Sequence, residues 1–543
     1  MFSEPVVGER FFGREEVLDL LNKRVLALKE GYRQNVALTG QSLAGKSSIL
    51  LHFLATVKDE PFIPVYLEVV KEPFRSFANR FIATLLYHAL AKTGEAVEID
   101  MSSLLEKASK ALPKTHAAIK HIMASVEHGE YDEAYTSLLN LTSVVKEETK
   151  IPCIVIFDEF DNLEQIGVKN TFLNFGKVIM VQKNTMYIVS SSRNQAIKKI
   201  LSEKLSLLFG NFEIVKISGF DTKKASEFLD IKLAGFEADD EIKRFVISFT
   251  DGNPFYLNHI AARLEGIAAA RMSNHIDSSV VEQAILDLVY NSNGVIHQYL
   301  LNYVLDLLDA RSREISLPIM IAIARGKNRQ PEIGRAVKAQ RSEIAKALER
   351  LLEQGFISKN GVFYRIDDAM LEFWLKHVYQ KRRELLVDDA TARSRLFESE
   401  LKAYMEGTLN EYRQGVAAQI ADLFGCFSNE LIQVDAKQMK LPHFTKVEVR
   451  ALNGSKPCVT ASFRGKTWVV QPCETYVGEN EIIDYMRAVK TLDRSVAQRI
   501  IMPLKGIDEN AKLLAKELKI AIWDAPVVNM LLTFYGKKRT VTL

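Results

Sequence analysis

The stretch GQSLAGKS at Gly40–Ser47 decides the fold of the N-terminal part of the chain, because it matches the pattern G-x-x-x-x-G-K-S. It follows the strand-like run NVALTG at 35–40 and opens the helical run SSILLHFLATV at 47–57. The glycines of such a loop let consecutive backbone amides curl around phosphate oxygens, and the N-terminus of the next helix adds a favourable field. The pattern therefore predicts a phosphate-binding loop between a strand and a helix.

The same loop predicts a nucleotide ligand. Lys46 should reach the β- and γ-phosphates, and the hydroxyl of Ser47 should ligate magnesium, so ATP and Mg²⁺ are the expected ligands. A glycine-rich turn with an incidental lysine is the alternative interpretation. The residues expected to contact the nucleotide in this stretch are Gly40, Gln41, Ser42, Leu43, Ala44, Gly45, Lys46, Ser47 and Ser48.

A second candidate element is IVIFDEFDNL at 154–163, an apolar run that ends in two acids. An acidic residue at the C-terminal end of a strand faces the ligand crevice of a parallel sheet. We expect Asp158 to hold magnesium and Glu159 to orient or deprotonate the attacking water. Asp161 is expected to belong to the surface turn that follows. A strand that runs into an acidic turn is the alternative.

The next strand-like run, MYIVSSS at 186–192, ends in a polar tip. A tip at this edge would lie beside the γ-phosphate, so Ser191 or Ser192 is expected to bond to it. Arg193 is expected to sense its charge. For the serines, a helix N-cap is the alternative.

Short β-branched runs alternate with helical stretches between 36 and 220, which predicts an α/β fold with a parallel sheet. The interval 75–148 should hold several helices, and 221–310 is helical by pattern, with Asp221 as a candidate cap. The predicted domains are a P-loop ATPase core at 1–220, a helical lid at 221–310, a winged helix at 311–387 and a nuclease-like α/β domain at 388–543.

Two further motifs point to a known family. RFFGREEVLDLL at 10–21 precedes the first core strand, and DGNPFYLNHI at 251–260 lies in the helical region. With the phosphate loop, they resemble the archaeal-ATPase branch of the STAND class of P-loop ATPases, which is related to replication-initiator (AAA+) ATPases. The resemblance implies that Phe12, Arg14 and Pro254 line the adenine. The Ser-Ser-Arg tip is similar to the strand-end arginine of NB-ARC relatives.

The winged helix is predicted from a helical stretch at 340–356 and a hairpin around Asn360-Gly361, since both turn residues tolerate positive φ. Such a module invites nucleic-acid binding. Cations around the helix favour it, acids between them dilute it, and docking against the ATPase core is the alternative. The cations are Arg335, Lys338, Arg341, Lys346, Arg350 and Lys359.

The region after 388 is predicted to start with one long helix at 395–424 and to continue as a mixed α/β domain. It resembles the PD-(D/E)XK nuclease fold, in which Glu398 fits the helix position and Glu448 lies on the first strand. The second strand reads Gln471-Pro472-Cys473-Glu474 where E-x-K would stand. The resemblance therefore implies a degenerate nuclease fold that is used for binding or assembly.

Composition narrows the class of protein. The chain has 71 Lys and Arg against 68 Asp and Glu, a net charge of +3, which excludes a histone-like polycation. Its four cysteines lack paired-ligand spacing, so we expect neither a disulfide framework nor a zinc site. Apolar runs such as 151–157 are too short to span a membrane. We expect a cytoplasmic protein with no membrane partner.

These observations predict a magnesium-dependent molecular switch that binds and hydrolyses ATP, with DNA or RNA as a candidate partner. Two alternatives remain. One is a scaffold in which ATP is a structural ligand and self-association, or binding to another protein, is the output. The other is an ATP-gated nuclease.

Overall fold

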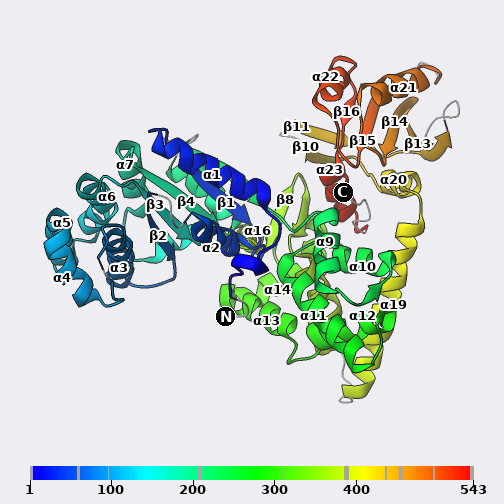
Figure 1. Ribbon diagram of the computed structural model, residues 1–543. Coiled ribbons are helices and arrows are strands. Elements are labelled where there is room, and N and C mark those ends of the chain that lie inside the picture. Colours follow the sequence, from blue (N-terminus) through cyan, green and yellow to red (C-terminus); the bar gives the residue numbers. More distant parts are fainter. Residues whose placement is uncertain are drawn as a thin grey trace. The chain divides into compact units, whose positions relative to one another are not determined.

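The computed structural model describes residues 4–57, 61–95, 97–205, 211–308, 310–384, 390–434, 437–451, 457–492 and 496–537. The chain divides into two units (Figure 1). The first runs to Ser218 and includes Glu353–Gly355, and the second comprises Gly219–Leu352 and Phe356–Leu543. The predicted domain boundaries at 220, 310 and 387 remain predictions.

The first unit contains the predicted parallel sheet. Its strands are β1 (Asn35–Gly40), β2 (Ile63–Glu68), β3 (Cys153–Asp158), β4 (Thr185–Ser191) and β5 (Phe212–Ile217). They pair in the order β2-β3-β4-β1-β5, and every pair is parallel. Because β3, β4 and β1 are neighbours and run parallel, their carboxyl ends lie together at one edge of the sheet. The phosphate loop, Asp158 and the polar tip of β4 follow those three ends.

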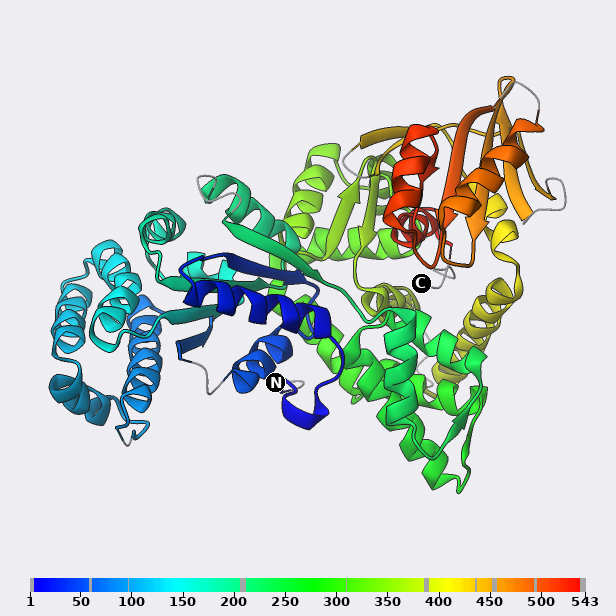
Figure 2. The ribbon, with the colours of Figure 1, turned by 45° about the horizontal axis from the view of Figure 1, so that its top comes forward.

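Helices cover both faces of this sheet, which explains why β1, β3 and β4 are buried along their whole length. On β3, Ile154 and Ile156 pack into the core that α1 and α2 cover. The alternate residues Val155 and Phe157 pack into the core on the other face, against α3, α6 and α7. In Figures 1 and 2, helices α3–α6 gather beside the β2 edge.

The interval between β2 and β3 holds several helices, as predicted. The helices of the first unit are η1 (Gly8–Arg10), α1 (Glu15–Lys29), α2 (Lys46–Thr56), α3 (Phe74–Lys92), α4 (Met101–Ala111), α5 (Pro113–Glu127), α6 (Tyr131–Thr149), η2 (Phe160–Gln165), α7 (Thr171–Val181), α8 (Asn194–Lys199) and η3 (Ile200–Lys204).

The second unit begins with a helical region. It contains α9 (Thr222–Lys232), α10 (Asp240–Thr250), α11 (Pro254–Ala270), α12 (Ser278–Ile285), η5 (Leu286–Tyr290) and α13 (Val295–Leu307). The predicted cap is confirmed, because Asp221 accepts a hydrogen bond from the amide of Lys224 at 2.7 Å. The prediction of helix throughout missed a two-residue parallel pair, β6 (Glu237–Ala238) with β7 (His275–Ile276).

The first residues of the second unit pack closely against Gly252-Asn253-Pro254, which we call the Gly-Asn-Pro motif. The amide of Phe220 donates to the carbonyl of Gly252 at 2.8 Å. A Cβ atom on Gly219 would lie 2.1 Å from the carbonyl oxygen of Asp251, and one on Gly252 would lie 2.1 Å from that of Phe220. Only glycine allows the two backbones to approach this closely.

The helix predicted at 340–356 and the hairpin after it are present. The elements of this region are α14 (Ala310–Ala324), α15 (Gln330–Val337), α16 (Arg341–Glu353), the antiparallel hairpin β8 (Ile357–Asn360) with β9 (Phe363–Ile366), α17 (Ala369–Trp374), η6 (Leu375–Tyr379) and α18 (Gln380–Glu384). The predicted turn was placed one residue early, because Asn360 belongs to β8. Of the two predicted turn residues only Gly361 has a positive φ, of 58°.

The hairpin turn packs against the C-terminal part of the chain. The side-chain amide of Asn360 donates to the carbonyl of Gln433 at 2.8 Å, and its oxygen accepts from the amide of Gln433 at 2.7 Å. The ring of Phe363 stacks on Phe534, with 4.9 Å between ring centroids. We call these contacts of the β8–β9 turn the hairpin joint.

The single helix predicted at 395–424 is wrong. The chain forms α19 (Ala390–Arg413) and α20 (Val416–Gly425), and Gly415 has the extended conformation of an N-cap between them. The side chain of Gln419 donates to the carbonyl of Gln414 at 3.1 Å, which provides a partner for a carbonyl left at the break.

The C-terminal domain holds a five-stranded mixed sheet in the order β12-β13-β14-β15-β16, in which β12 to β14 are antiparallel and β14 to β16 parallel. A separate hairpin of β10 and β11, which was not predicted, precedes it. The elements are β10 (Glu430–Val434), β11 (Lys437–Leu441), β12 (Lys446–Ala451), β13 (Pro457–Phe463), β14 (Lys466–Cys473), α21 (Glu479–Lys490), β15 (Val496–Pro503), α22 (Glu509–Glu517), β16 (Ala521–Ile522) and α23 (Ala525–Phe534). Within the described residues, none of the helices is both long and apolar enough to cross a bilayer.

Candidate nucleotide site

The phosphate loop connects β1 to α2, as predicted. Leu43 and Gly45 both have positive φ, of 59° and 95°, and this alternation turns loop amides toward a common concavity. Lys46 is the first residue of α2 and is only 4% exposed. Its ammonium group donates to the carbonyls of Gly40 at 3.2 Å and Gln41 at 2.8 Å. The loop residues therefore form the cradle that the sequence pattern predicts.

Lys46 also faces the carboxylates of β3. Burial lowers the pKa of Lys46, while the neighbouring Glu159, Asp158 and Asp161 favour its charged form. The lysine thus lies between the loop carbonyls and the acidic end of the adjacent strands. An anion placed in the loop would provide the close counter-charge that a buried ammonium group requires.

Asp158 ends β3 and is 2% exposed. Its two carboxylate oxygens accept hydrogen bonds from hydroxyl groups of the neighbouring strands: Tyr66 on β2 at 2.9 Å and Ser190 on β4. Burial, followed by the charge of Asp158, raises the pKa of Tyr66 far above its usual range, so Tyr66 remains a donor. Sequence reasoning missed Tyr66, and β-strand alternation could not identify it without the register between β2 and β3.

Glu159 follows directly and has a left-handed backbone conformation, with φ of 52°. Its carboxylate accepts hydrogen bonds from the hydroxyl and, at 3.1 Å, from the amide of Ser192. The Ser192 hydroxyl in turn accepts from the ammonium group of Lys46 at 2.9 Å. Burial raises the pKa of Glu159, although the charge of Lys46 opposes this effect. Ser192 therefore connects Lys46 with Glu159.

The structure separates the two candidate serines. Ser192 contacts Lys46, whereas the hydroxyl of Ser191 donates to Asp161 at 2.6 Å. Arg193 forms an ion pair with Asp161 and donates to the side chain of Asn162 at 2.6 Å. Asp161 was expected in a surface turn, but it is 4% exposed and holds both Ser191 and Arg193. The predicted roles of Ser191 and Arg193 at the γ-phosphate remain predictions.

The N-terminal motif lies against the phosphate loop within the first unit. The guanidinium of Arg14 donates to the carbonyls of Ala44 at 3.2 Å and Ser218 at 2.5 Å. The ring of Phe11 stacks on His52 of α2 at 4.0 Å between centroids. The amide of Val6 donates to the hydroxyl of Ser48 at 3.0 Å. Phe12, which follows Phe11 in the sequence, is partly buried.

Pro254 is the first residue of α11 in the second unit. Asn253 caps this helix by accepting from the amide of Phe255 at 3.0 Å. The hydroxyl of Tyr256 donates to Asp368, the N-cap of α17, at 2.7 Å. The helix α11, which begins at this motif, is thus hydrogen-bonded to the region predicted as a winged helix. An adenine contact for Phe12, Arg14 or Pro254 remains a prediction.

Two acids of the nuclease-like pattern, Glu448 and Glu398, lie on β12 and α19. Glu448 pairs with Lys446 at 2.7 Å and with Arg450, on the same strand. Glu398, which was expected on the helix beside the sheet, lies on α19 and accepts from Ser394 at 3.2 Å. Across the described part of the chain, no group of three or more His, Cys, Asp or Glu side chains could hold a metal ion.

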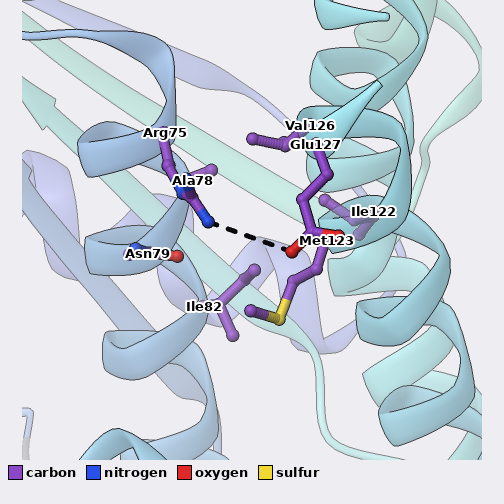
Figure 3. A pocket seen from close by; sticks show the side chains of 8 residues that line it. All are labelled: Arg75, Ala78, Asn79, Ile82, Ile122, Met123, Val126 and Glu127. Carbon is purple, nitrogen blue, oxygen red and sulfur yellow. Dashed lines mark ion pairs between the residues drawn. The ribbon is translucent and has the colours of Figure 1, made fainter. Parts of the chain in front are cut away.

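A narrow groove between α3 and α5 lies in the helical insertion (Figure 3). Apolar side chains such as Ile82, Ile122 and Met123 line it, and Arg75 lies 3.9 Å from Glu127 across it. None of the predicted nucleotide-binding residues lines this groove.

The phosphate-loop region fits magnesium by the chemistry of its donor groups. Asp158 supplies a buried carboxylate at the edge of the sheet where the loop begins, and the hydroxyl donors to it are neutral. Ser47 follows Lys46 at the start of α2. Carboxylate and hydroxyl oxygens are the hard ligands that Mg²⁺ prefers, with water and substrate phosphates completing its shell.

Residues 11–260 match the model of a protein family described as an ATPase domain predominantly from Archaea. These residues are therefore similar to the ATPase domains of that family. A sequence comparison with curated proteins gives no match. The matched range begins at the N-terminal motif and ends in α11, so it includes the phosphate loop, the β3 acids and the Gly-Asn-Pro motif.

A comparison with solved structures gives matches of low sequence identity. A Walker-type ATPase of Pyrococcus abyssi has 19% identity and a TM-score of 0.48, and the match covers 69% of this chain and 99% of that chain. The ORC2 protein of Aeropyrum pernix has 10% identity and a TM-score of 0.43, with 71% and 98% covered. RuvB of Thermotoga maritima, a Holliday junction branch migration motor, has 15% identity and a TM-score of 0.33, with 67% and 96% covered.

Proposed function

We propose that this chain is a magnesium-dependent switch that binds ATP in the phosphate loop and hydrolyses it. The observation that carries the proposal is the connected set Lys46–Ser192–Glu159. The hydroxyl of Ser192 accepts a hydrogen bond from the ammonium group of Lys46 at 2.9 Å, and the backbone amide of Ser192 donates to the carboxylate of Glu159 at 3.1 Å. A buried cation and a partly buried carboxylate thus share one serine at the sheet edge where the loop begins.

The phosphate loop, Lys46, Glu159 and the two magnesium ligands each have a specific task in this proposal. Amides of the loop and the ammonium group of Lys46 bind the phosphates and stabilise the charge that develops on the transferred group. Glu159 accepts a hydrogen bond from the attacking water and aligns it with the γ-phosphorus. Ser47 and Asp158 would hold Mg²⁺, which neutralises charge on the β- and γ-phosphate oxygens.

The γ-phosphate would change the partners of Ser192. A phosphate oxygen that accepts from Lys46 competes with the Ser192 hydroxyl for the same ammonium group. Because the Ser192 hydroxyl also donates to Glu159, a movement of Ser192 would change the hydrogen bonding of Glu159, the residue that aligns the water. ATP and ADP therefore favour different arrangements of this serine, which is the local basis that a switch requires.

Two substitutions test the proposal. Lys46→Ala should weaken ATP binding about 100-fold, because charge-assisted hydrogen bonds to phosphate are lost. Glu159→Gln should keep ATP affinity within about threefold but lower turnover by about 100-fold or more, because the water loses its acceptor. Calorimetry measures the affinity, and release of inorganic phosphate measures turnover.

The control variants are Lys120→Ala and Glu133→Gln, which remove exposed charges of the first unit. They should leave both quantities unchanged. Hydrolysis by Glu159→Gln at the wild-type rate would contradict the assigned role of the carboxylate. Equal behaviour with ATP and ADP in light scattering would instead favour the scaffold alternative.

For the partner, we propose nucleic acid bound at the α15–α16 turn. Residues 311–387 hold 16 Lys and Arg against 9 Asp and Glu, whereas the whole chain has a net charge of only +3. The side chains of Lys338, Arg341 and Lys346 are exposed at this turn and on α16. Concentrated positive charge on a helix-turn-helix is the electrostatic feature that phosphate backbones bind.

A further inference from the structure

Tyr66 brings a hydroxyl from β2 to the predicted magnesium ligand on β3. In the parallel register, Glu68 lies opposite Asp158 and Tyr66 lies opposite Ile156. Because side chains alternate along a strand, Tyr66 lies on the same face of the sheet as Asp158. Ile156 and Tyr66 pack into the core beneath α1 and α2, so this face is also the face of the helix that carries Ser47.

The carboxylate of Asp158 is held from two sides. Tyr66 donates to Oδ2 at 2.9 Å, while Ser190 and, at 3.2 Å, the amide of Glu159 donate to Oδ1. A carboxylate offers about four acceptor directions. Three are occupied by groups fixed in β2, β4 and the β3 end, which leaves Oδ2 with an acceptor direction for a metal or a metal-bound water.

We infer that Tyr66 is a positioning residue for magnesium: its hydroxyl fixes the rotation of the Asp158 carboxylate so that the carboxylate is oriented for the cation before the cation binds. The inference rests on the proposed function, because it requires Asp158 to serve the metal. Outer hydrogen-bond partners of metal ligands commonly contribute 10- to 100-fold in affinity because they remove this rotational freedom.

This role separates metal binding from nucleotide binding. Tyr66 has no hydrogen bond to the phosphate loop among the contacts described, and its hydroxyl partner is Asp158 alone in them. Removal of the hydroxyl should therefore weaken the binding of the cation and leave the affinity for metal-free nucleotide intact. A residue with a merely structural role would lower folding stability and both affinities together.

The test is Tyr66→Phe, which removes only the hydroxyl. Mn²⁺ replaces Mg²⁺ as the probe, and electron paramagnetic resonance measures free Mn²⁺ during titration of the protein with a bound non-hydrolysable ATP analogue. The Kd for Mn²⁺ should rise about tenfold. Affinity for the analogue in EDTA, measured by calorimetry, should stay within twofold of wild type.

Tyr87→Phe is the matched control, because Tyr87 is also partly buried but lies on α3. It should leave the Kd for Mn²⁺ unchanged. Ser190→Ala, which removes the other hydroxyl from Asp158, should raise that Kd by a similar factor and provides a second measurement if Tyr66→Phe unfolds.

The outcomes distinguish this inference from the proposed function. If wild-type protein binds the analogue but gains no Mn²⁺ site, the magnesium site itself is wrong. If wild type binds Mn²⁺ and both Tyr66→Phe and Ser190→Ala bind it equally well, the magnesium site stands and the positioning role is overturned.

Discussion

Asp368 is a partly buried carboxylate of the second unit, and neutral groups donate hydrogen bonds to it. It accepts hydrogen bonds from Tyr256 at 2.7 Å and from the amides of Met370 at 2.9 Å and Leu371 at 3.0 Å. Burial raises the pKa of Asp368; these hydrogen bonds oppose the shift, and the charge of Asp251 adds to it. Asp368 therefore caps α17 and binds Tyr256 of α11, and its ionisation lowers the stability of the folded state.

The raised pKa predicts a pH-dependent effect of Asp368→Asn. The folded state binds a proton more tightly than the unfolded state, whose Asp pKa is about 3.9, so wild-type stability falls as pH rises through the interval between the two pKa values. Asparagine caps helices equally well and has no such cost. The variant should therefore gain stability relative to wild type as pH increases from 4 to 8.

Urea unfolding followed by tryptophan fluorescence measures this difference. All three tryptophans, Trp374, Trp468 and Trp523, lie in the second unit, so the signal reports that unit. Asp221→Asn, at the exposed N-cap of α9 in the same unit, measures the effect of the substitution itself. A difference between Asp368→Asn and wild type that is the same at every pH would contradict the prediction.

At the residue scale, the motif predicted the loop that holds Lys46, because a phosphate loop is local in sequence. It could not distinguish Ser192 from Ser191, since neighbouring residues of a strand end point in opposite directions and the exact end was unknown. Nor could it identify Tyr66, whose contact with Asp158 depends on pairing between β2 and β3. These contacts join residues 92 to 146 positions apart, beyond the reach of spacing rules.

At the element scale, the hairpin joint gives the β8–β9 turn a structural task. A Cβ on Gly361 would lie 2.0 Å from the carbonyl oxygen of Leu431, and φ at this residue is positive. Nearby, Arg329 forms an ion pair with Glu430, and Asn328 donates to the carbonyl of Phe534. The β8–β9 turn is thus held against the C-terminal part of the chain, although Lys359 and Val362 beside it stay exposed.

Gly361→Ala should destabilise the second unit by about 2 kcal/mol or more, because the new methyl group clashes with backbone and the left-handed conformation disfavours alanine. The matched control is Gly326→Ala, which has a φ of 81° and open space around its Cβ position. Urea unfolding monitored by tryptophan fluorescence compares them. Equal losses for the two variants would mean that the hairpin joint contributes nothing.

Sequence patterns predicted these elements unevenly. The Asn-Gly pair indicated the hairpin, because few residues tolerate a positive φ, but it gave no sign that Asn360 bonds to Gln433. The break at Gly415 was missed because the apolar spacing continues across it. The β10–β11 pair, Glu430–Val434 with Lys437–Leu441, was missed because alternating polar residues make its apolar signal weak.

At the scale of the whole molecule, charge is unevenly distributed, and this predicts salt-sensitive binding. Joint replacement of Lys338, Arg341 and Lys346 by alanine should weaken DNA or RNA binding and reduce the slope of log affinity against log salt by about 2 to 3, because each phosphate contact releases about one counterion. Fluorescence anisotropy at several salt concentrations measures both quantities.

The control removes the same charge elsewhere: Lys114, Lys120 and Lys177 are exposed cations of the first unit. Their joint replacement by alanine should leave the slope nearly unchanged. Equal effects of the two triple variants, or no binding by wild type even at low salt, would contradict a nucleic-acid site at α15–α16.

The peptide bond between Ser218 and Gly219 joins the two units, and its neighbours are anchored on both sides. Before it, Arg14 binds the carbonyls of Ser218 and Ala44. After it, Phe220 is hydrogen-bonded to Gly252, and Gly219 leaves no room for a side chain. Each of these anchors lies within its own unit, one at Arg14 and the other at Gly252. Displacement of Ala44 in the phosphate loop would therefore move the guanidinium that also holds the carbonyl of Ser218, the residue at which the chain leaves the first unit.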